Sequence, residues 1–575
     1  MTVMNALISN SKKSQRFWLA LSFIFAIIYS CLALKQAFSH EYVIQDDARQ
    51  HVFWTLRFLD AELFPNDLIA DYFQSVAPAG YSFMYGFVAN LGINPVLFSK
   101  LVPLGLDLIL TGYCWGISLA IFPVPLAGFL STLLLNQYLW LRDDLVSGTP
   151  VAFIYPLFLA FVYYLLQEKL IPCLVSITLL GLFYPQGVLI AMGILTLRLV
   201  QWKQGRIPTI DAKQLPFCGT GLFVSFLIML FYALTSSEYG PVISAEQAKS
   251  MLEFLEDGKS EFFINDFGAY WVTGQRTGIM PRFHTVLPLI ATGILIILLP
   301  FRRWFSLFQL ATGKVRILFE ITLASLGMFF LSHLFLFRLH LPSRYTEHSL
   351  RIVSAIAGAM AFVILIGKLC QWMQKLRQPS PNLKQGFVLT SIGVLLAIPL
   401  LNPLWMDEFP DTEYVVGRYP QLYQFLREQP QDSLVASVVE EVNNIPIFAR
   451  RSILIGGEGY PVPYHLEYYR QIKERTLDLI RAYYTTDLSV LKNFVNDYGV
   501  DFLLVRGGVF TPEFIKESEP SDWLQQYQPI TQKVLTSLQN GETPILALTQ
   551  QECSVFTEKN MQVVAADCIL ELSSR

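Results

Sequence analysis

Two adjacent acids, Asp46 and Asp47, follow the first hydrophobic segment of the chain, and the imidazole of His51 comes shortly after them. On a helix, Asp47 and His51 are four residues apart and share one face. A carboxylate there could take a proton from an incoming hydroxyl group while the histidine tunes it, or it could help to hold a divalent metal ion. The structural alternative is a helix N-terminus, where the helix dipole favours acids. The spacing alone does not separate these interpretations.

A second acidic pair, Asp143 and Asp144, lies in a short polar stretch between two apolar segments. Four acids on two short loops could converge on one catalytic or metal-binding site, because carboxylates are good ligands for divalent cations. The alternative is a solvated turn before the helix start Ser147-Gly148-Thr149-Pro150. Taken alone, this stretch favours the turn.

Basic groups concentrate in a third stretch, residues 338–351, which holds three arginines and two histidines. Arginine forms forked hydrogen bonds to phosphate, so the cluster could hold a lipid-linked phosphate or diphosphate. The alternative is that arginines at helix ends extend toward the membrane surface, which fits Arg338 and Arg351 but fits Arg344 poorly. The candidate phosphate-binding residues are Arg344, His340, Tyr345, Arg276 and Arg282.

The composition predicts a membrane environment for these groups. Of the 575 residues, 53% are hydrophobic and only 15% are charged, and mean hydropathy is +0.43. In soluble domains about a quarter of all residues are charged. Many apolar runs approach or exceed the length that crosses a bilayer, whereas the chain from about residue 402 has a soluble composition. The net charge of −3 gives no sign of nucleic-acid binding.

The pattern predicts a polytopic α-helical membrane protein with about 11 transmembrane helices. The expected spans are 17–38, 94–121, 123–141, 152–167, 170–184, 186–200, 216–234, 286–300, 317–337, 351–367 and 386–401. Four clusters of lysine and arginine then fall on one side, which the positive-inside rule makes cytoplasmic. The N-terminus is therefore expected inside, and the C-terminal domain outside.

This topology predicts a transmembrane domain over residues 1–401 and a soluble extracytoplasmic domain over 402–575. The external loops of the first domain are 39–93, 142–151, 235–285 and 338–351. Within the first loop, residues 51–67 carry apolar residues at helical spacing and predict an amphipathic helix lying on the membrane. Residues 78–91 are apolar but short, and predict a re-entrant or interfacial segment.

The C-terminal region alternates helical and strand patterns, which predicts an α/β domain. Helices are expected at 422–427, 468–484 and 488–498, and strands at 433–439, 452–455 and 500–505. Cys553 and Cys568 are its two cysteines, and outside the cytoplasm they could form a disulfide.

The arrangement resembles the GT-C superfamily of integral-membrane glycosyltransferases. The resemblance rests on the Asp46-Asp47 pair after the first span and on Pro342-Ser343-Arg344-Tyr345 in a later loop. Asp143-Asp144-Leu145, Phe183-Tyr184-Pro185-Gln186 and Tyr498-Gly499-Val500-Asp501 also resemble a bacterial, cyanobacterial-like branch. No signature of a mannosyl-, arabinosyl- or aminoarabinose-transferring subfamily is present.

The resemblance implies an inverting transferase that moves a sugar from a polyprenyl-phosphate donor to a glycan, lipid or protein acceptor. Asp46 or Asp47 would be the general base, with Asp46 slightly favoured because Asp47 is placed to pair with His51. Arg344 would bind the donor phosphate. If the enzyme is metal-dependent, Asp46, Asp47, Asp143 and Asp144 would hold Mg²⁺ or Mn²⁺. The location would be a bacterial inner membrane, with the C-terminal domain in the periplasm.

Two other classes of function remain open at this stage. A transporter or lipid flippase would place ionisable groups near the bilayer midplane, whereas the charges here concentrate in external loops. A non-catalytic membrane scaffold that binds a glycan would not need so many spans.

Overall fold

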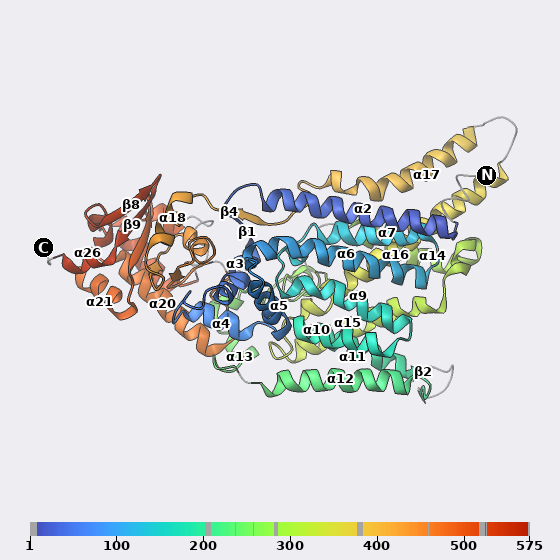
Figure 1. Cartoon of the computed structure of the whole chain (residues 1–575), viewed down its shortest axis with the longest axis horizontal. Helices are drawn as coiled ribbons and strands as arrows, with labels where there is room; N and C mark the ends of the chain where they lie inside the picture. Colours follow the sequence, from blue (N-terminus) through green and yellow to red (C-terminus); the bar gives the residue numbers. More distant parts are fainter. Residues whose placement is uncertain are drawn as a thin grey trace.

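The computed structural model describes residues 9–201, 209–235, 237–256, 258–280, 286–376, 383–457, 459–516, 524 and 526–572. A long helical bundle forms one end of the molecule and an α/β domain the other, with helices α3 (Asp46–Val52), α4 (Leu68–Val76) and α5 (Ala79–Asn90) at their junction (Figure 1). The residues of chemical interest lie near this junction.

A helix occurs at each of the predicted spans. These helices are α2 (Lys12–Ala37), α6 (Pro95–Ile121), α7 (Pro125–Leu139), α9 (Ile154–Leu166), α10 (Leu170–Phe183), α11 (Pro185–Leu199), α12 (Leu215–Leu234), α14 (Leu287–Leu298), α15 (Arg316–Leu334), α16 (Glu347–Lys375) and α17 (Leu383–Leu401). Among the described residues, seven helical segments are long and apolar enough to cross a membrane, and three further apolar helices are shorter. The chain is thus a multi-pass membrane protein, while the count of eleven spans stays a prediction.

Helix α16 is the central helix of the bundle and is buried over most of its 29 residues. It packs against α7, α14, α15 and α17. Small residues permit the close approach: a Cβ atom added at Gly358 would come within 3.1 Å of the Pro288 carbonyl oxygen on α14. The first turn of this helix carries Glu347 and His348, and Arg351 begins the second turn.

The predicted amphipathic helix over residues 51–67 is wrong. Helix α3 ends at Val52, the 3₁₀ helix η1 (Phe53–Phe58) follows, and α4 begins only at Leu68. Phe64 and Asn66 have positive φ on either side of Pro65, so the chain turns there. Val52 to Leu56 and Leu63 face the protein interior, where they are buried, whereas Leu59 is 40% exposed.

Helix α5 occupies the short apolar segment that was expected to be re-entrant or interfacial. Its 12 residues give it a length of about 18 Å, which is less than the hydrocarbon thickness of about 30 Å. Its inner face fixes both acidic loops: the Tyr81 hydroxyl donates to the His51 carbonyl at 3.1 Å, and the Tyr85 hydroxyl donates to the Gly148 carbonyl at 2.9 Å. Whether α5 enters the membrane stays a prediction.

The predicted α/β character of the C-terminal region is confirmed. Its sheet has the order β6-β5-β7-β9-β8, parallel across β6, β5 and β7 and antiparallel across β7, β9 and β8. The strands are β5 (Leu434–Ala436), β6 (Ser452–Ile453), β7 (Phe502–Arg506), β8 (Ser554–Glu558) and β9 (Met561–Ala565). The helices include α18 (Pro420–Glu428), α19 (Ile445–Phe448), α20 (Leu466–Tyr484), α21 (Leu488–Tyr498), α22 (Pro512–Lys516), α24 (Gln528–Gln539), α25 (Ile545–Thr549) and α26 (Ala566–Glu571).

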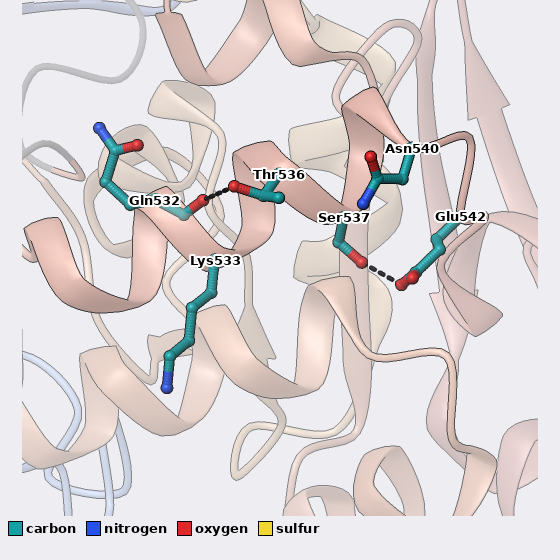
Figure 2. Close-up of a pocket in the computed structure, with 6 residues that line it drawn as sticks. All are labelled: Gln532, Lys533, Thr536, Ser537, Asn540 and Glu542. Carbon is teal, nitrogen blue, oxygen red and sulfur yellow. Dashed lines mark hydrogen bonds between the residues drawn. The ribbon is translucent and has the colours of Figure 1, made fainter.

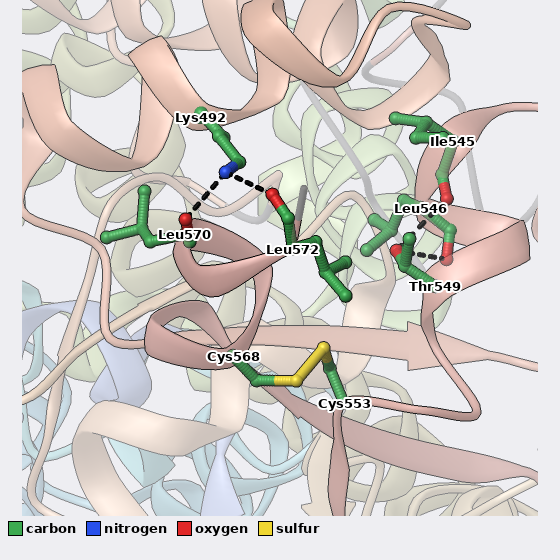
Figure 3. The surroundings of a disulfide bond; sticks show 8 residues. All are labelled: Lys492, Ile545, Leu546, Thr549, Cys553, Cys568, Leu570 and Leu572. Carbon is green, nitrogen blue, oxygen red and sulfur yellow. Dashed lines mark hydrogen bonds between the residues drawn. A yellow bond between two sulfur atoms is a disulfide. The ribbon is translucent and has the colours of Figure 1, made fainter. Parts of the chain in front are cut away.

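The Cys553–Cys568 disulfide, possible from the sequence, is present and joins the start of β8 to α26 (Figure 3). The same helix is held from the other side by Lys492, whose ammonium group donates to the carbonyls of Leu570 and Leu572, both at 2.6 Å. The C-terminal end of the described chain is therefore fixed to the sheet.

A two-stranded pairing joins the two parts of the molecule. Strand β1 (Val43–Gln45), directly before α3, pairs antiparallel with β4 (Tyr414–Val416), which follows the last helix of the bundle. The loop that follows α2 is therefore bound to the base of the C-terminal region. The exact domain boundary at residues 401 and 402 stays a prediction.

Candidate active site

The first acidic pair occupies the first turn of α3, directly after β1. The side-chain oxygen of Gln45 caps this helix by accepting from the Ala48 amide at 3.1 Å. The Asp46 amide donates to the Glu413 carbonyl at 3.1 Å, which continues the β1–β4 pairing. Strand pairing and capping together fix the positions of Asp46 and Asp47.

Asp46 forms an ion pair with Arg49, one turn further along α3. The guanidinium of Arg49 is buried, and it also donates to the side-chain oxygen of Asn444 at 3.1 Å. Asn444 belongs to the C-terminal domain, directly before α19. The negative charge of Asp46 is therefore already compensated, through an arginine that the C-terminal domain helps to orient.

Asp47 is half-buried. Charged residues of the 142–151 and 338–351 loops act on its carboxyl group. Burial raises the pKa of Asp47 well above its usual range, and repulsion from Asp143 and Asp46 adds to the rise while Arg344 opposes it. The pKa of Asp47 thus responds to the charges of Asp143 and Arg344, which lie roughly 100 and 300 residues away in sequence. A carboxyl group with a raised pKa suits a general base that works near neutral pH.

The second acidic pair is held by helix α8 (Asp143–Val146), and Asp144 is buried against α16. Arg351 donates to an oxygen of Asp144 at 2.7 Å, and the Tyr155 hydroxyl donates to the same oxygen at 3.1 Å. Burial opposes ionisation, but Arg351 and His348 outweigh it and keep the pKa of Asp144 below its usual range. Asp144 is therefore a charged partner of arginine at neutral pH.

Glu347 joins three arginines around one carboxylate. Arg142 and Arg351 donate to the same oxygen of Glu347 at 2.8 and 2.7 Å, and Arg344 donates to the other oxygen at 3.2 Å. Arg142 also lies 3.9 Å from Asp143. The second loop, the 338–351 loop and α16 are thus joined by one ion-pair network.

Exposure separates the arginines of this network. The side chain of Arg351 is 1% exposed and that of Arg142 is 6% exposed, whereas that of Arg344 is 29% exposed. The 3₁₀ helix η8 (Pro342–Tyr345) carries Arg344, and Ser343 in that helix donates through its amide and hydroxyl groups to the carbonyls of Arg276 and Gln275. Arg344 is therefore the arginine of the network that is best placed to meet a ligand.

Several members of the network were not assigned to the site from the sequence. They are Tyr155, Tyr184, Arg142, Glu347, His348 and Arg351. The His348 ring lies between two hydroxyls, with Tyr155 at 2.9 Å from one nitrogen and Tyr184 at 3.4 Å from the other. Tyr184 could have been assigned to the site from the sequence, because it lies in the motif Phe183-Tyr184-Pro185-Gln186. Tyr155 lies in an apolar run that contains no such motif.

The predicted pairing of Asp47 with His51 is not formed among the described residues. The His51 ring packs edge-on against Phe73, with 5.3 Å between ring centroids. Burial alone lowers the pKa of His51 to about 4, so the ring is neutral near pH 7. It is therefore a residue of α3 that packs against α4.

The other candidate phosphate-binding residues differ in their placement. Burial and the nearby Arg344 lower the pKa of His340 to about 4, so it stands close to Arg344 as a neutral ring. The Arg276 guanidinium donates to the Lys259 carbonyl at 3.1 Å, and the fully buried Tyr345 donates to the Leu339 carbonyl. Both stabilise loops next to Arg344. Arg282 lies outside the described residues.

The predicted set of four metal-binding acids does not assemble. Within the described ranges of the chain, no three histidine, cysteine, aspartate or glutamate side chains are grouped so that they could hold a metal ion. Asp46 and Asp144 are instead directed at Arg49 and Arg351. The donor set as arranged does not fit Mg²⁺ or Mn²⁺, which need several oxygen ligands around one point.

A hollow elsewhere on the surface contains none of these groups. It lies along α24 in the C-terminal domain and is lined by Gln532, Lys533, Thr536, Ser537, Asn540 and Glu542 (Figure 2). The candidate active site is therefore the charged cluster at the junction, defined by Asp46, Asp47, Asp143, Asp144, Arg344, Glu347 and Arg351.

Comparison with known proteins defines the fold. No family model matches the sequence, and no curated protein matches it. The archaeal oligosaccharyltransferase AglB from Archaeoglobus fulgidus, in complex with an inhibitory peptide and a dolichol-phosphate, aligns at 11% identity over 90% of this chain and 72% of that chain, with a TM-score of 0.55. The Archaeoglobus fulgidus oligosaccharyltransferase tethered to an acceptor peptide with the NVT sequon aligns at 11% identity over 91% and 72%, with a TM-score of 0.51.

These matches show that the chain shares the fold of the two oligosaccharyltransferase structures. They extend through both the bundle and the C-terminal region, since about nine tenths of this chain is covered. At 11% identity the similarity concerns the fold.

Proposed function

We propose that this chain is an inverting glycosyltransferase that moves a sugar from a polyprenyl-phosphate donor to an acceptor on the extracytoplasmic side of the membrane. The observation that carries the proposal is the ion-pair network that joins Arg344, Glu347, Arg142 and Asp143. The charges of Asp143 and Arg344 also act on the pKa of Asp47. A base and an exposed phosphate-binding group are the two parts that such a transfer needs. A similar structure was determined with dolichol-phosphate, which supports a lipid-linked donor.

The proposed base is Asp47, and this reverses the slight preference for Asp46 drawn from the sequence. Asp46 is already paired with Arg49, whereas the expected partner of Asp47, His51, is turned away toward Phe73. The raised pKa of Asp47 makes it the better proton acceptor.

The reaction then proceeds as a single displacement at the anomeric carbon. An acceptor hydroxyl on a glycan, lipid or protein loses its proton to Asp47 as its oxygen bonds to the sugar. The bond between the anomeric carbon and the phosphate oxygen breaks, and its electron pair remains on that oxygen. Attack on the face opposite the phosphate inverts the configuration. Arg344 stabilises the charge that develops on the leaving phosphate.

The ion-pair network orients Arg344 for this task. Glu347 accepts from Arg344 at 3.2 Å and is itself held by Arg142 and Arg351 at 2.8 and 2.7 Å. Since Glu347 stands in the first turn of the buried helix α16, the geometry of Arg344 is tied to the rigid part of the bundle. Fixed charges of this kind need little reorganisation during reaction.

The proposed location is a bacterial inner membrane, with the N-terminus in the cytoplasm and the C-terminal domain in the periplasm. The basic clusters that suggest this orientation include Arg198 at the end of α11 and Arg316 at the start of α15. This end of the bundle is remote from the α/β domain (Figure 1). The charged cluster would then face the outer leaflet, where a lipid-linked phosphate is accessible.

Separate substitutions of the two acids test the proposal. Full-length protein in proteoliposomes is supplied with a panel of polyprenyl-phosphate hexoses and pentoses and with an envelope extract as acceptor. Asp47→Asn should lower sugar transfer by about 10²- to 10⁴-fold, the usual contribution of a general base, while Asp46→Asn should have a smaller effect. Retention of the native unfolding temperature in both variants is the control. Full activity of Asp47→Asn would remove Asp47 from the mechanism.

A further inference from the structure

We propose that this transferase works without a metal ion and takes a donor that carries a single phosphate, because arginines already balance the acids that a metal ion would otherwise bind. The inference rests on the function proposed above and specifies its donor. It follows from three features of the cluster: which groups pair, how deeply the arginines are buried, and how many charges remain.

Arginine occupies the places where a cation would have to stand. Asp46 pairs with Arg49, and Asp144 is bonded to Arg351 at 2.7 Å. Glu347 accepts from three arginines at 2.7 to 3.2 Å. A divalent ion would need these carboxylate oxygens at about 2.0–2.6 Å from its centre, so each arginine would have to leave first.

The arginines cannot leave at little cost, because they are buried. The side chains of Arg49 and Arg351 are 5% and 1% exposed, and that of Arg142 is 6% exposed. A guanidinium group left in such a place without its carboxylate is strongly unfavourable. Two of the pairs are also built within single helices, Asp46 with Arg49 in α3 and Glu347 with Arg351 in α16. They therefore form wherever those helices form.

The charge balance favours one phosphate over two. Five carboxylates (Asp46, Asp47, Asp143, Asp144 and Glu347) face four guanidinium groups (Arg49, Arg142, Arg344 and Arg351), an excess of one negative charge when Asp47 is ionised. Arg344 has the most exposed side chain of the four, at 29%, and its fork matches two oxygens of one phosphate. A diphosphate would bring a further negative charge, and the side chains of the other three arginines of the cluster are at most 6% exposed.

The transfer step keeps this balance. As the phosphodiester of the donor becomes a phosphomonoester, it gains one negative charge, and Asp47 loses one by accepting the proton of the acceptor. The total charge of the site is unchanged, so no additional cation is required at the end of the reaction. Arg344 lies beside the group that gains charge, and Asp47 is the group that loses it.

Manganese binding tests the metal part independently of activity. Full-length protein in nanodiscs is stripped with a chelator and titrated with Mn²⁺, and free Mn²⁺ is followed by electron paramagnetic resonance. We expect that the acidic pairs bind no Mn²⁺. The free Mn²⁺ signal should therefore be the same for the native protein and for Asp47→Asn throughout the titration. Stoichiometric binding that is lost in Asp47→Asn or Asp143→Asn would overturn the proposal.

Binding of two sugar-free lipids tests the donor part. Polyprenyl monophosphate and polyprenyl diphosphate of equal chain length are titrated into the same protein in detergent. The monophosphate is expected to bind at least about tenfold more tightly, which is about 1.4 kcal/mol, and Arg344→Met should abolish the difference. Arg198→Met is the matched control, since it breaks a partly buried pair with Glu320 at the opposite end of the bundle. Tighter binding of the diphosphate would overturn the donor assignment.

The two failures are distinguishable. If neither lipid binds and no transfer occurs, the proposed function fails, while the Mn²⁺ titration still decides whether the acids hold a metal ion. If transfer occurs but requires Mg²⁺ or Mn²⁺ after chelation, the proposed function stands and the metal-independent mechanism is refuted.

Discussion

Replacing Arg351 with methionine is the most informative perturbation of the network. Arg351 is buried at the start of the second turn of α16, where it donates to Asp144 at 2.7 Å, to Glu347 at 2.7 Å and to the Tyr155 hydroxyl at 2.8 Å. Methionine retains much of the side-chain volume but no charge. The variant therefore leaves buried carboxylates in place without the cation that stabilises them.

The expected loss of stability follows from which carboxylate loses its partner. Removing one member of a buried ion pair costs about 3–5 kcal/mol. Glu347 keeps Arg142 at 2.8 Å and Arg344 at 3.2 Å, so the uncompensated group is Asp144. The free energy of unfolding should fall by about 3 kcal/mol, at the lower end of that range.

The pH dependence of the loss has a defined sign. In the native protein the pKa of Asp144 is held below its usual range, so this group contributes stability at neutral pH that is lost as the pH falls. Without Arg351, burial dominates and the folded-state pKa rises above the unfolded value. The protonated, uncharged form of Asp144 is then tolerated in the buried site. The difference in the free energy of unfolding between Arg351→Met and the native protein should therefore shrink as the pH is lowered.

Reversible unfolding in mixed micelles measures the effect. Arg198→Met is the control, because Glu320 there keeps Arg316 at 2.8 Å and a smaller loss is expected. The double variant Arg351→Met with Asp144→Asn should regain most of the lost stability, since it removes the orphaned charge. Equal losses in Arg351→Met and Arg198→Met, or no recovery in the double variant, would refute the network as described.

Three further predictions concern Asp47, the disulfide and the contact between the domains. Asp143→Asn should lower the pKa of Asp47 by removing a repulsive charge, so the acid limb of kcat/KM against pH should move to lower pH; a shift to higher pH would contradict this. The double variant Cys553→Ser with Cys568→Ser should lower the free energy of unfolding by about 3 kcal/mol, because the disulfide closes a loop with a sequence separation of 15. Reductant should likewise lower the stability of the native protein, and no effect of reductant would contradict the prediction. Gly459→Ala should lower stability by more than about 1 kcal/mol and also reduce transfer, because φ is +66° and the added Cβ would overlap the end of the Gln50 side chain of α3. An unchanged unfolding temperature and unchanged activity would contradict it.

The fold was predictable where the sequence pattern is long and uniform. Each expected span has a helix, and the α/β alternation after residue 402 is correct. The prediction failed over residues 51–67, where apolar spacing suggested one amphipathic helix. Positive φ at Phe64 and Asn66 interrupts it, and tertiary burial of Val52 to Leu56 replaces the expected contact with lipid.

The site was predictable only in part, because its chemistry depends on pairings across the chain. Asp47 and Arg344 could be proposed as site residues from local motifs. Arg351 fitted the pattern of an arginine at a helix end that extends toward the membrane surface, yet its side chain is 1% exposed and bonded to Asp144. Tyr155 lies in an apolar helix, so nothing in its local sequence indicates that its hydroxyl bonds Asp144.

A structure of the full-length protein with bound polyprenyl monophosphate is the most direct test of the central claim. The phosphate is predicted to lie within about 3 Å of the Arg344 guanidinium, with the Asp47 carboxylate across the space that the sugar would occupy. Density for the phosphate at another position, with Arg344 and Asp47 facing no ligand, would contradict the assignment of this cluster as the active site of a lipid-linked sugar transferase.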